Sequence, residues 1–129
     1  MTRRELRVPG LPEPISHYAD AVQAGEVLYV SGIVPVGEDG VVVGPGDVVA
    51  QARQVFALLR RVLDAAGGGP GDVAKVTVFL LHVDDRPRIN PVRQEFFGSS
   101  RPASTLVEGS GLAGPGALLE VEAVAHLGP

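Results

Sequence analysis

Two glutamates near the end of the chain have the spacing and the surroundings that acid–base chemistry requires. The stretch 117–127, ALLEVEAVAHL, alternates in the manner of a β-strand, and Glu120 and Glu122 fall on the same side of it, about 7 Å apart. The other side of the strand is entirely aliphatic, so this strand is expected in the middle of a sheet. A carboxylate in such surroundings is costly unless it is paired, hydrated or functional. The two glutamates are therefore either candidate acid–base groups or simply the solvent-facing side of the strand.

The composition disfavours several other kinds of site. The chain has 129 residues, 45% hydrophobic and 20% charged, with a net charge of −4 and no cysteine, so it has neither disulfides nor thiolate metal ligands. The three histidines have no metal-ligand spacing, and we expect no metal or other cofactor. The basic residues form no run and aromatic residues are few, which disfavours a nucleic-acid surface. We see no membrane-spanning run and no secretory signal, and therefore expect a cytoplasmic protein with no membrane partner.

The hydrophobic pattern predicts one α+β domain over residues 1–129, with about six strands in a mixed sheet and two helices. Apolar residues that alternate or run continuously favour strands, and apolar residues at helical spacing favour helices. Strands are predicted at 5–8, 27–34, 41–43, 73–83, 103–108 and 117–127, and helices at 48–66 and 86–97.

Both predicted helices have recognisable start signals. Gly46 or Asp47 is expected to cap the first helix, which carries Gln51 on its outer side. Pro91 lies inside the second helical pattern, where proline removes a backbone hydrogen bond. Because Asn90 followed by Pro91 is a good cap and first-position pair, the second helix either covers 86–97 or starts at Asn90, after a separate turn over 86–89.

Glycines mark two further features of the chain. Gly32 lies inside the strand predicted at 27–34, where glycine is typical of a bulge or of a place where another group approaches the backbone. Residues 109–116 contain four glycines and one proline, and we expect them to form a mobile loop.

Two helices can cover only one face of a six-stranded sheet. The strand at 27–34 carries aliphatic or aromatic residues on both of its sides, and so does the stretch 76–81. No third layer remains in the chain to cover the second face, and soluble monomers avoid a large exposed apolar surface. We therefore expect identical chains to pack sheet against sheet with cyclic symmetry, which places Glu120 and Glu122 in or near an interface cleft.

Seven stretches of the chain, in their order and spacing, resemble the Rid family, also called the YjgF or reactive-intermediate-deaminase family. The resemblance implies a chorismate-mutase-like α+β fold and a barrel-like homotrimer, with sites for a small-molecule substrate in clefts between neighbouring subunits. The family's best-known activity is the hydrolysis of small imines or enamines to a carbonyl compound and ammonia. The stretches are SHYADAV at 16–22, LYVSGIVPV at 28–36, QARQVFALLRRVLDAAG at 51–67, DVAKVTVFL at 72–80, NPVRQEFF at 90–97, RPASTLVE at 101–108 and LLEVEAVA at 118–125.

The resemblance also implies roles for single residues. Glu120 matches the carboxylate that holds the attacking water, and a partly desolvated glutamate with a raised pKa can act as acid or base. Tyr18 matches a tyrosine near the cleft, and Gly32 matches the glycine whose backbone lines it. Asn90 matches the asparagine of the second helix. These four residues form the main part of the predicted site.

The chain departs from the family pattern at Ser104. In typical deaminases of the family, an arginine follows the Pro-Ala pair found here at 102–103, and it binds the substrate carboxylate with two hydrogen bonds. Serine provides neither the charge nor the two donors, and losing such a contact costs about 2–5 kcal/mol. Arg88, Arg93 or Arg101 could supply a replacement charge. Ser104 alone predicts a substrate other than a standard 2-imino acid.

Other residues near these positions have a structural and a functional interpretation. Leu106, two residues beyond Ser104, completes the predicted substrate-binding set, and Glu108 faces the same cleft in one of the two registers. His17 precedes Tyr18 and could act as a general acid or base, although a surface histidine is the simpler interpretation.

Three functions are compatible with the sequence. The first is a hydrolase of the imine or enamine deaminase type, with Glu120 activating water. The second is a repurposed enzyme of a specialised pathway, such as one for condensation, tautomerisation or dehydration, and the missing arginine motivates it. The third is a non-catalytic trimer that binds small molecules or proteins. Some relatives are described as ribonucleases or translation inhibitors, but the negative net charge makes that function the least favoured here.

Overall fold

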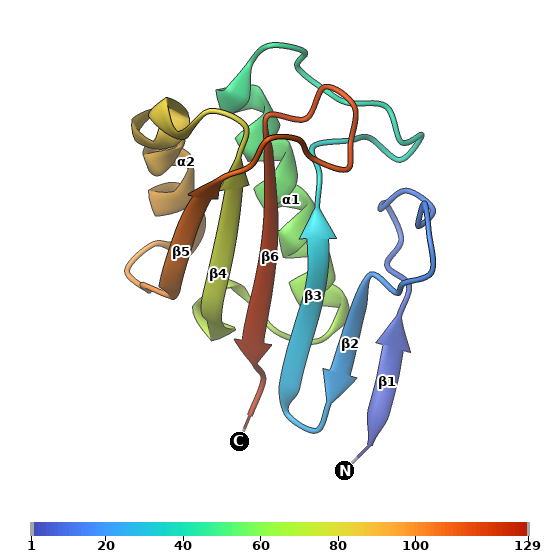
Figure 1. Cartoon of the computed structure of the whole chain (residues 1–129). Helices are drawn as coiled ribbons and strands as arrows, with labels where there is room; N and C mark the ends of the chain where they lie inside the picture. Colours follow the sequence, from blue (N-terminus) through green and yellow to red (C-terminus); the bar gives the residue numbers. More distant parts are fainter. Residues whose placement is uncertain (1, 129) are drawn as a thin grey trace.

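A computed structural model describes residues 2–128 and shows one six-stranded sheet with two helices on one of its faces (Figure 1). The strand order is β1-β2-β3-β6-β4-β5, and every neighbouring pair is antiparallel except β4 and β5. The α+β class, the mixed sheet and the number of elements predicted from the sequence are therefore confirmed. The strands are β1 Arg3–Leu6, β2 Ala21–Ala24, β3 Val27–Ile33, β4 Val73–Leu80, β5 Ala103–Glu108 and β6 Leu119–His126, and the helices are α1 Val48–Ala65 and α2 Arg86–Phe97, with short 3-10 helices at Pro70–Asp72 and Val83–Asp85.

One strand of the structure was not predicted, and one predicted strand is absent from the sheet. β2 has no counterpart in the predicted strands, because alanine and glutamine have low strand propensity, but pairing with β1 and β3 on its two sides stabilises it. Residues 41–43, predicted as a strand, contribute only an isolated bridge between Val36 and Val42. The prediction of a strand at 41–43 is wrong, because this segment forms a single bridge and not a ladder of paired residues.

Helix α1 begins where the sequence places it, at the Asp47 cap, whose Oδ1 accepts a hydrogen bond from the Ala50 N–H at 3.0 Å. The outer position expected for Gln51 is wrong, because this side chain is fully buried. Neither helix within residues 2–128 combines the length and the apolar character that a membrane crossing requires.

Helix α2 runs without a break from Arg86 through Pro91, so the predicted range 86–97 is confirmed and the alternative start at Asn90 is wrong. Pro91 leaves the carbonyl of Pro87, four residues earlier, without its helical donor. Both prolines are exposed, and water can therefore hydrogen-bond to that carbonyl. The cost of the internal proline is small enough for the turn before it to join the helix.

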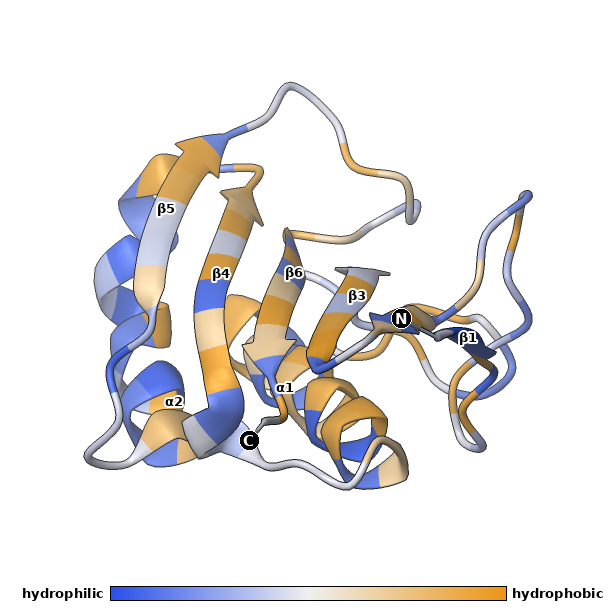
Figure 2. Cartoon of the chain, turned by 90° about the horizontal axis from the view of Figure 1, so that it is seen from below, coloured by the Kyte–Doolittle hydropathy of each residue, from blue (hydrophilic) through white to orange (hydrophobic). Residues whose placement is uncertain are grey.

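The two faces of the sheet have different surroundings. On the helix side, Leu119, Val121, Ala123 and Ala125 of β6 are buried, as the alternation in the sequence predicts. In the part of the chain that the structure describes, the helices lie on that side and no helix covers the opposite one (Figure 2). We call this opposite side the open face. Large side chains are exposed on it, including Tyr29 at 52% and Val107 at 38%, among polar neighbours.

Candidate functional site

Glu120 lies on the open face, in a cavity formed where β3 and β6 meet the loops at 15–18 and 109–116. The carboxylate is half-buried, and the cavity has a volume of about 210 Å³ and is open to solvent. Its lining contains three residues of the predicted site, Tyr18, Gly32 and Glu120. The remaining lining residues are Ile15, Ser16, Ser31, Val34 and Ala113.

Gly32 makes room for the Glu120 side chain. A Cβ atom at position 32 would lie 3.0 Å from Cδ of Glu120 and closer still to Oε2, so any larger residue would push the carboxylate away. The pairing of β3 with β6 also changes register between Val30 and Ile33, on either side of this glycine. Both uses of a strand glycine considered in the sequence, the bulge and the close approach, occur at this one position.

The surroundings of Glu120 favour its protonated form. Burial raises the pKa of the Glu120 carboxyl above its ordinary value of 4.5, and the nearby charge of Glu122 raises the pKa further. A hydrogen bond from the backbone at Ala113 lowers the pKa, but the net shift is upward. A carboxyl group with a raised pKa can both accept and donate a proton closer to neutral pH.

Ser31 fixes the segment that carries Tyr18 beside this cavity, a role that the sequence analysis missed. Its Oγ donates to the carbonyl of Ala19 at 2.6 Å, and its N–H donates to the carbonyl of Asp20 at 3.1 Å. The Tyr18 ring, which is 44% exposed, is thereby held next to Gly32. A serine directly before a strand glycine is the only sequence signal of this contact.

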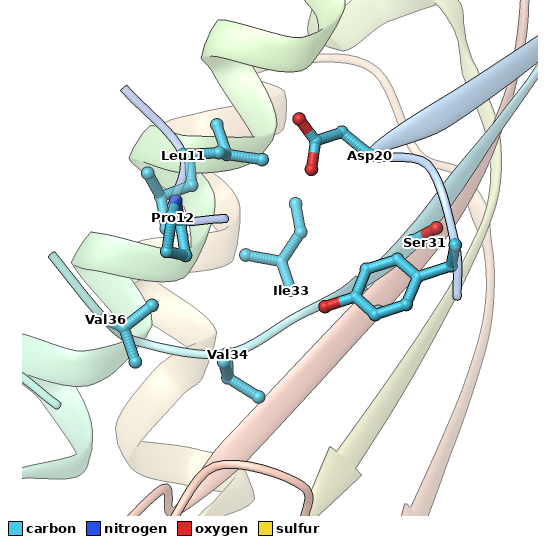
Figure 3. A pocket seen from close by; sticks show the side chains of 10 residues that line it. Leu11, Pro12, Asp20, Ser31, Ile33, Val34 and Val36 are labelled. Carbon is cyan, nitrogen blue, oxygen red and sulfur yellow. The ribbon is translucent and has the colours of Figure 1, made fainter. Parts of the chain in front are cut away.

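Asp20 ties the segment that carries Tyr18 to Arg7 and Val8. Its carboxylate is almost fully buried and accepts hydrogen bonds from the N–H of Val8 at 2.7 Å and from Nη1 of Arg7 at 2.9 Å. The Arg7 guanidinium also pairs with Glu13 at 3.0 Å. A second cavity lies here, and Figure 3 shows Asp20 and Ser31 on one side of it and aliphatic side chains on the other, among them Leu11, Ile33, Val34 and Val36.

Gln51 of α1 holds the glycine-rich loop that passes over Glu120. Its Nε2 donates to the carbonyls of Gly44 and Gly116, each at 3.2 Å, and its Oε1 accepts from the N–H of Leu118 at 2.7 Å. These three bonds satisfy the buried amide and fix the end of the loop that carries Ala113. The loop predicted to be mobile is therefore anchored at its junction with β6.

The other predicted binding residues, Asn90, Ser104 and Leu106, lie outside the Glu120 cavity. Ser104 and Leu106 pair with buried residues of β4, so their side chains point to the helix side of the sheet, whereas Glu120 is on the open face. Arg93 of α2 donates from Nη2 to Oγ of Ser104 at 2.8 Å, which ties the helix carrying Asn90 to this strand. We call Asn90, Arg93, Ser104 and Leu106 the edge half of the candidate site, because they lie at β5, the last strand of the sheet.

The three possible contributors lie apart from Glu120. His17 lines a neighbouring hollow that shares Tyr18 with the Glu120 cavity. Glu108 accepts a hydrogen bond from the N–H of Val83 at 2.9 Å, and Arg101 is exposed. Within residues 2–128, no three His, Asp or Glu side chains gather closely enough to hold a metal ion.

Comparison with known proteins identifies the family. The family described as endoribonuclease L-PSP matches residues 10–127. The chain belongs to this family. It is 41% identical over 125 residues to the 3-aminoacrylate deaminase RutC of Acinetobacter baylyi, which covers 96% of this chain and 98% of the relative.

Solved structures of L-PSP family proteins have the same fold. The YjgF gene product of E. coli superimposes with a TM-score of 0.87 at 32% identity, covering 95% of this chain and 98% of that one. A Rid family protein, YyfA of Yersinia pestis, gives a TM-score of 0.91 at 30% identity and covers 97% of this chain and 99% of its own. The resemblance to the Rid family found in the sequence is confirmed, while the roles of individual residues stay predictions.

Proposed function

We propose that this L-PSP family protein hydrolyses a small imine or enamine, with Glu120 as the acid–base group. The observation that carries the proposal is the position of Glu120. Its carboxyl group has a raised pKa and lies in the space that a side chain at position 32 would occupy. The relative with 41% identity is a 3-aminoacrylate deaminase, which acts on an enamine. Together they support a deaminase over a passive binding protein.

The chemistry requires one group that first removes a proton and later returns it. Ionised Glu120 takes a proton from water while the water oxygen bonds to the imine carbon and the C=N π electrons move to nitrogen. Protonated Glu120 then gives the proton to that nitrogen to form a carbinolamine. The carboxylate next takes the hydroxyl proton and passes it to the nitrogen as the C–N bond breaks, which releases ammonia and forms the carbonyl. An enamine first takes a proton at carbon and loses one from nitrogen to become the imine, and the acid form of Glu120 can supply the proton at carbon.

We also propose that the cleft is completed by a second protomer in a homotrimer. The Glu120 cavity is on the open face and the edge half points away from it, so the two sets cannot meet within one chain. The open face exposes Tyr29 and Val107, which a neighbouring sheet would bury. Because β5 is the last strand, a neighbour that packs the β5 edge of its sheet against this open face would bring its edge half to Glu120.

The activity is tested by generating imines with an amino-acid oxidase and following carbonyl trapping by semicarbazide and ammonia release. Wild-type protein is expected to accelerate hydrolysis over buffer, and E120Q to lose about 10²–10⁴-fold of that acceleration. E122Q is the matched control, because Glu122 is on the same side of β6 but lines a different hollow, and it should keep most of the activity. No acceleration by the wild type, or equal rates for wild type and E120Q, would contradict the proposal.

A further inference from the structure

The guanidinium of Arg93 occupies the neighbourhood of Ser104. Its Nη2 atom donates to the serine Oγ at 2.8 Å, across the contact between α2 and β5. A positive charge is therefore present beside the residue whose lack of charge distinguishes the sequence. It comes from the helix instead of the strand.

Within residues 2–128, Arg93 differs from the other arginines near this edge in being half-buried without an acidic partner. Arg88 is exposed and pairs with Asp85 at 3.5 Å, and Arg101 is exposed. None of the ion pairs within residues 2–128 includes Arg93, although it is half-buried. Burial without a counter-charge lowers the pKa of the Arg93 guanidinium, and an anion placed beside it would reverse that penalty.

The guanidinium also keeps most of its donors free. An arginine side chain carries five N–H donors in a planar fork, and Ser104 accepts from only one nitrogen. The rest can bind the two oxygens of a carboxylate. Asn90, one helical turn before Arg93, is exposed on the same part of α2 and adds an amide donor.

We propose that Arg93, held in place by Ser104, binds the carboxylate of the substrate, so that the substrate class is imines or enamines that carry a carboxylate. This inference rests on the proposed hydrolysis in a cleft shared by two protomers. One end of the substrate lies at Glu120 of one protomer, and its carboxylate lies at Arg93 of the next. The expectation based on Ser104 alone, of a substrate other than a 2-imino acid, is thereby reversed.

The test compares two imines that differ by the carboxylate. One is the 2-imino acid made from leucine by an amino-acid oxidase, and the other is the imine made from isoamylamine by an amine oxidase. R93Q is expected to lower kcat/KM for the imino acid by about tenfold to a hundredfold, and to leave kcat/KM for the uncharged imine unchanged. S104A should give a smaller loss with the same selectivity, because it frees Arg93 without removing it. R86Q, which changes an exposed arginine of the same helix, should change neither rate.

An equal loss on both imines would show that Arg93 is structural, and no loss on either would show that it does not touch the substrate; both results overturn the inference. A second readout separates this inference from the proposed hydrolysis. Propionate and propionamide are titrated into the full chain and followed by NMR. Propionate binding that R93Q abolishes, without hydrolysis of either imine, would retain the carboxylate site and reject the deaminase. Hydrolysis of the imines without selective propionate binding would retain the deaminase and reject the carboxylate site at Arg93.

Discussion

The cavity at Glu120 and the edge half at Ser104 are held by very different means. At Glu120, the carboxylate lies against the backbone of Gly32, beside the bulge in β3, and accepts a hydrogen bond from the backbone at Ala113. At Ser104, one hydrogen bond from Arg93 joins an exposed strand edge to a helix. The proposed reactive group depends on the space that Gly32 leaves, whereas the proposed binding group depends on charge, which a neighbouring element can supply. A serine in place of arginine is therefore compatible with the proposed carboxylate site.

The largest effect is expected from G32A. The added methyl group would overlap the Glu120 carboxylate, and activity should fall about a hundredfold, close to the loss from removing the carboxylate. The matched control is G69A, because a Cβ at Gly69 meets no atom within 4 Å and its φ is −152°. G69A should keep its activity. An active G32A would show that the position of Glu120 is not set by this contact.

A second effect, on stability, is expected from Q51L. Leucine fills the buried space but leaves the carbonyls of Gly44 and Gly116 and the N–H of Leu118 without their partner, at a cost of about 3 kcal/mol in the free energy of unfolding. Urea denaturation measures this loss. R53A changes an exposed residue of the same helix and should change the stability by less than about 0.5 kcal/mol. A Q51L protein as stable as R53A would mean that the loop does not depend on Gln51.

The smallest expected effect is a gain in stability of E120Q over wild type that appears only as the pH rises. Because burial raises the pKa of Glu120, the folded protein holds this proton more tightly than the unfolded chain does, and wild type loses stability as pH rises through the folded pKa. Glutamine cannot ionise, so E120Q should match wild type near pH 4 and be slightly more stable near pH 8. The gain is small because the group is only half-buried. Urea denaturation of E120Q and wild type at both pH values, at one protein concentration, measures this difference, and its absence would contradict the raised pKa.

The features that could be predicted from the sequence depend on residues that are close together in the chain. The alternation in 117–127 fixes which side of β6 is buried, and a glycine inside an apolar strand predicts a bulge or a close contact at Gly32. β2 has weak strand propensity and forms because both neighbours pair with it. Gln51 looks like a surface residue because its three partners are backbone groups of distant loops.

The division of the site could not be predicted from residue types either. The face on which Ser104 and Leu106 lie depends on the register between β5 and β4, which spacing along one strand does not determine. Arg93 was one of three arginines that could reach Ser104, and only the packing of α2 against β5 distinguishes it. Contacts between elements far apart in the chain decide both points.

The central claim, that one protomer supplies Glu120 and the next supplies the edge half, is tested most directly by mixing inactive variants. E120Q and S104W, each expected to be inactive because one half of the site is damaged, are unfolded together in equal amounts and refolded. Random assembly places an undamaged Glu120 cavity against an undamaged edge half in about a quarter of the clefts, so about a quarter of wild-type activity should return. A mixture of E120Q with G32A, which damage the same half, should recover none. An E120Q and S104W mixture that stays inactive would contradict a cleft shared between protomers.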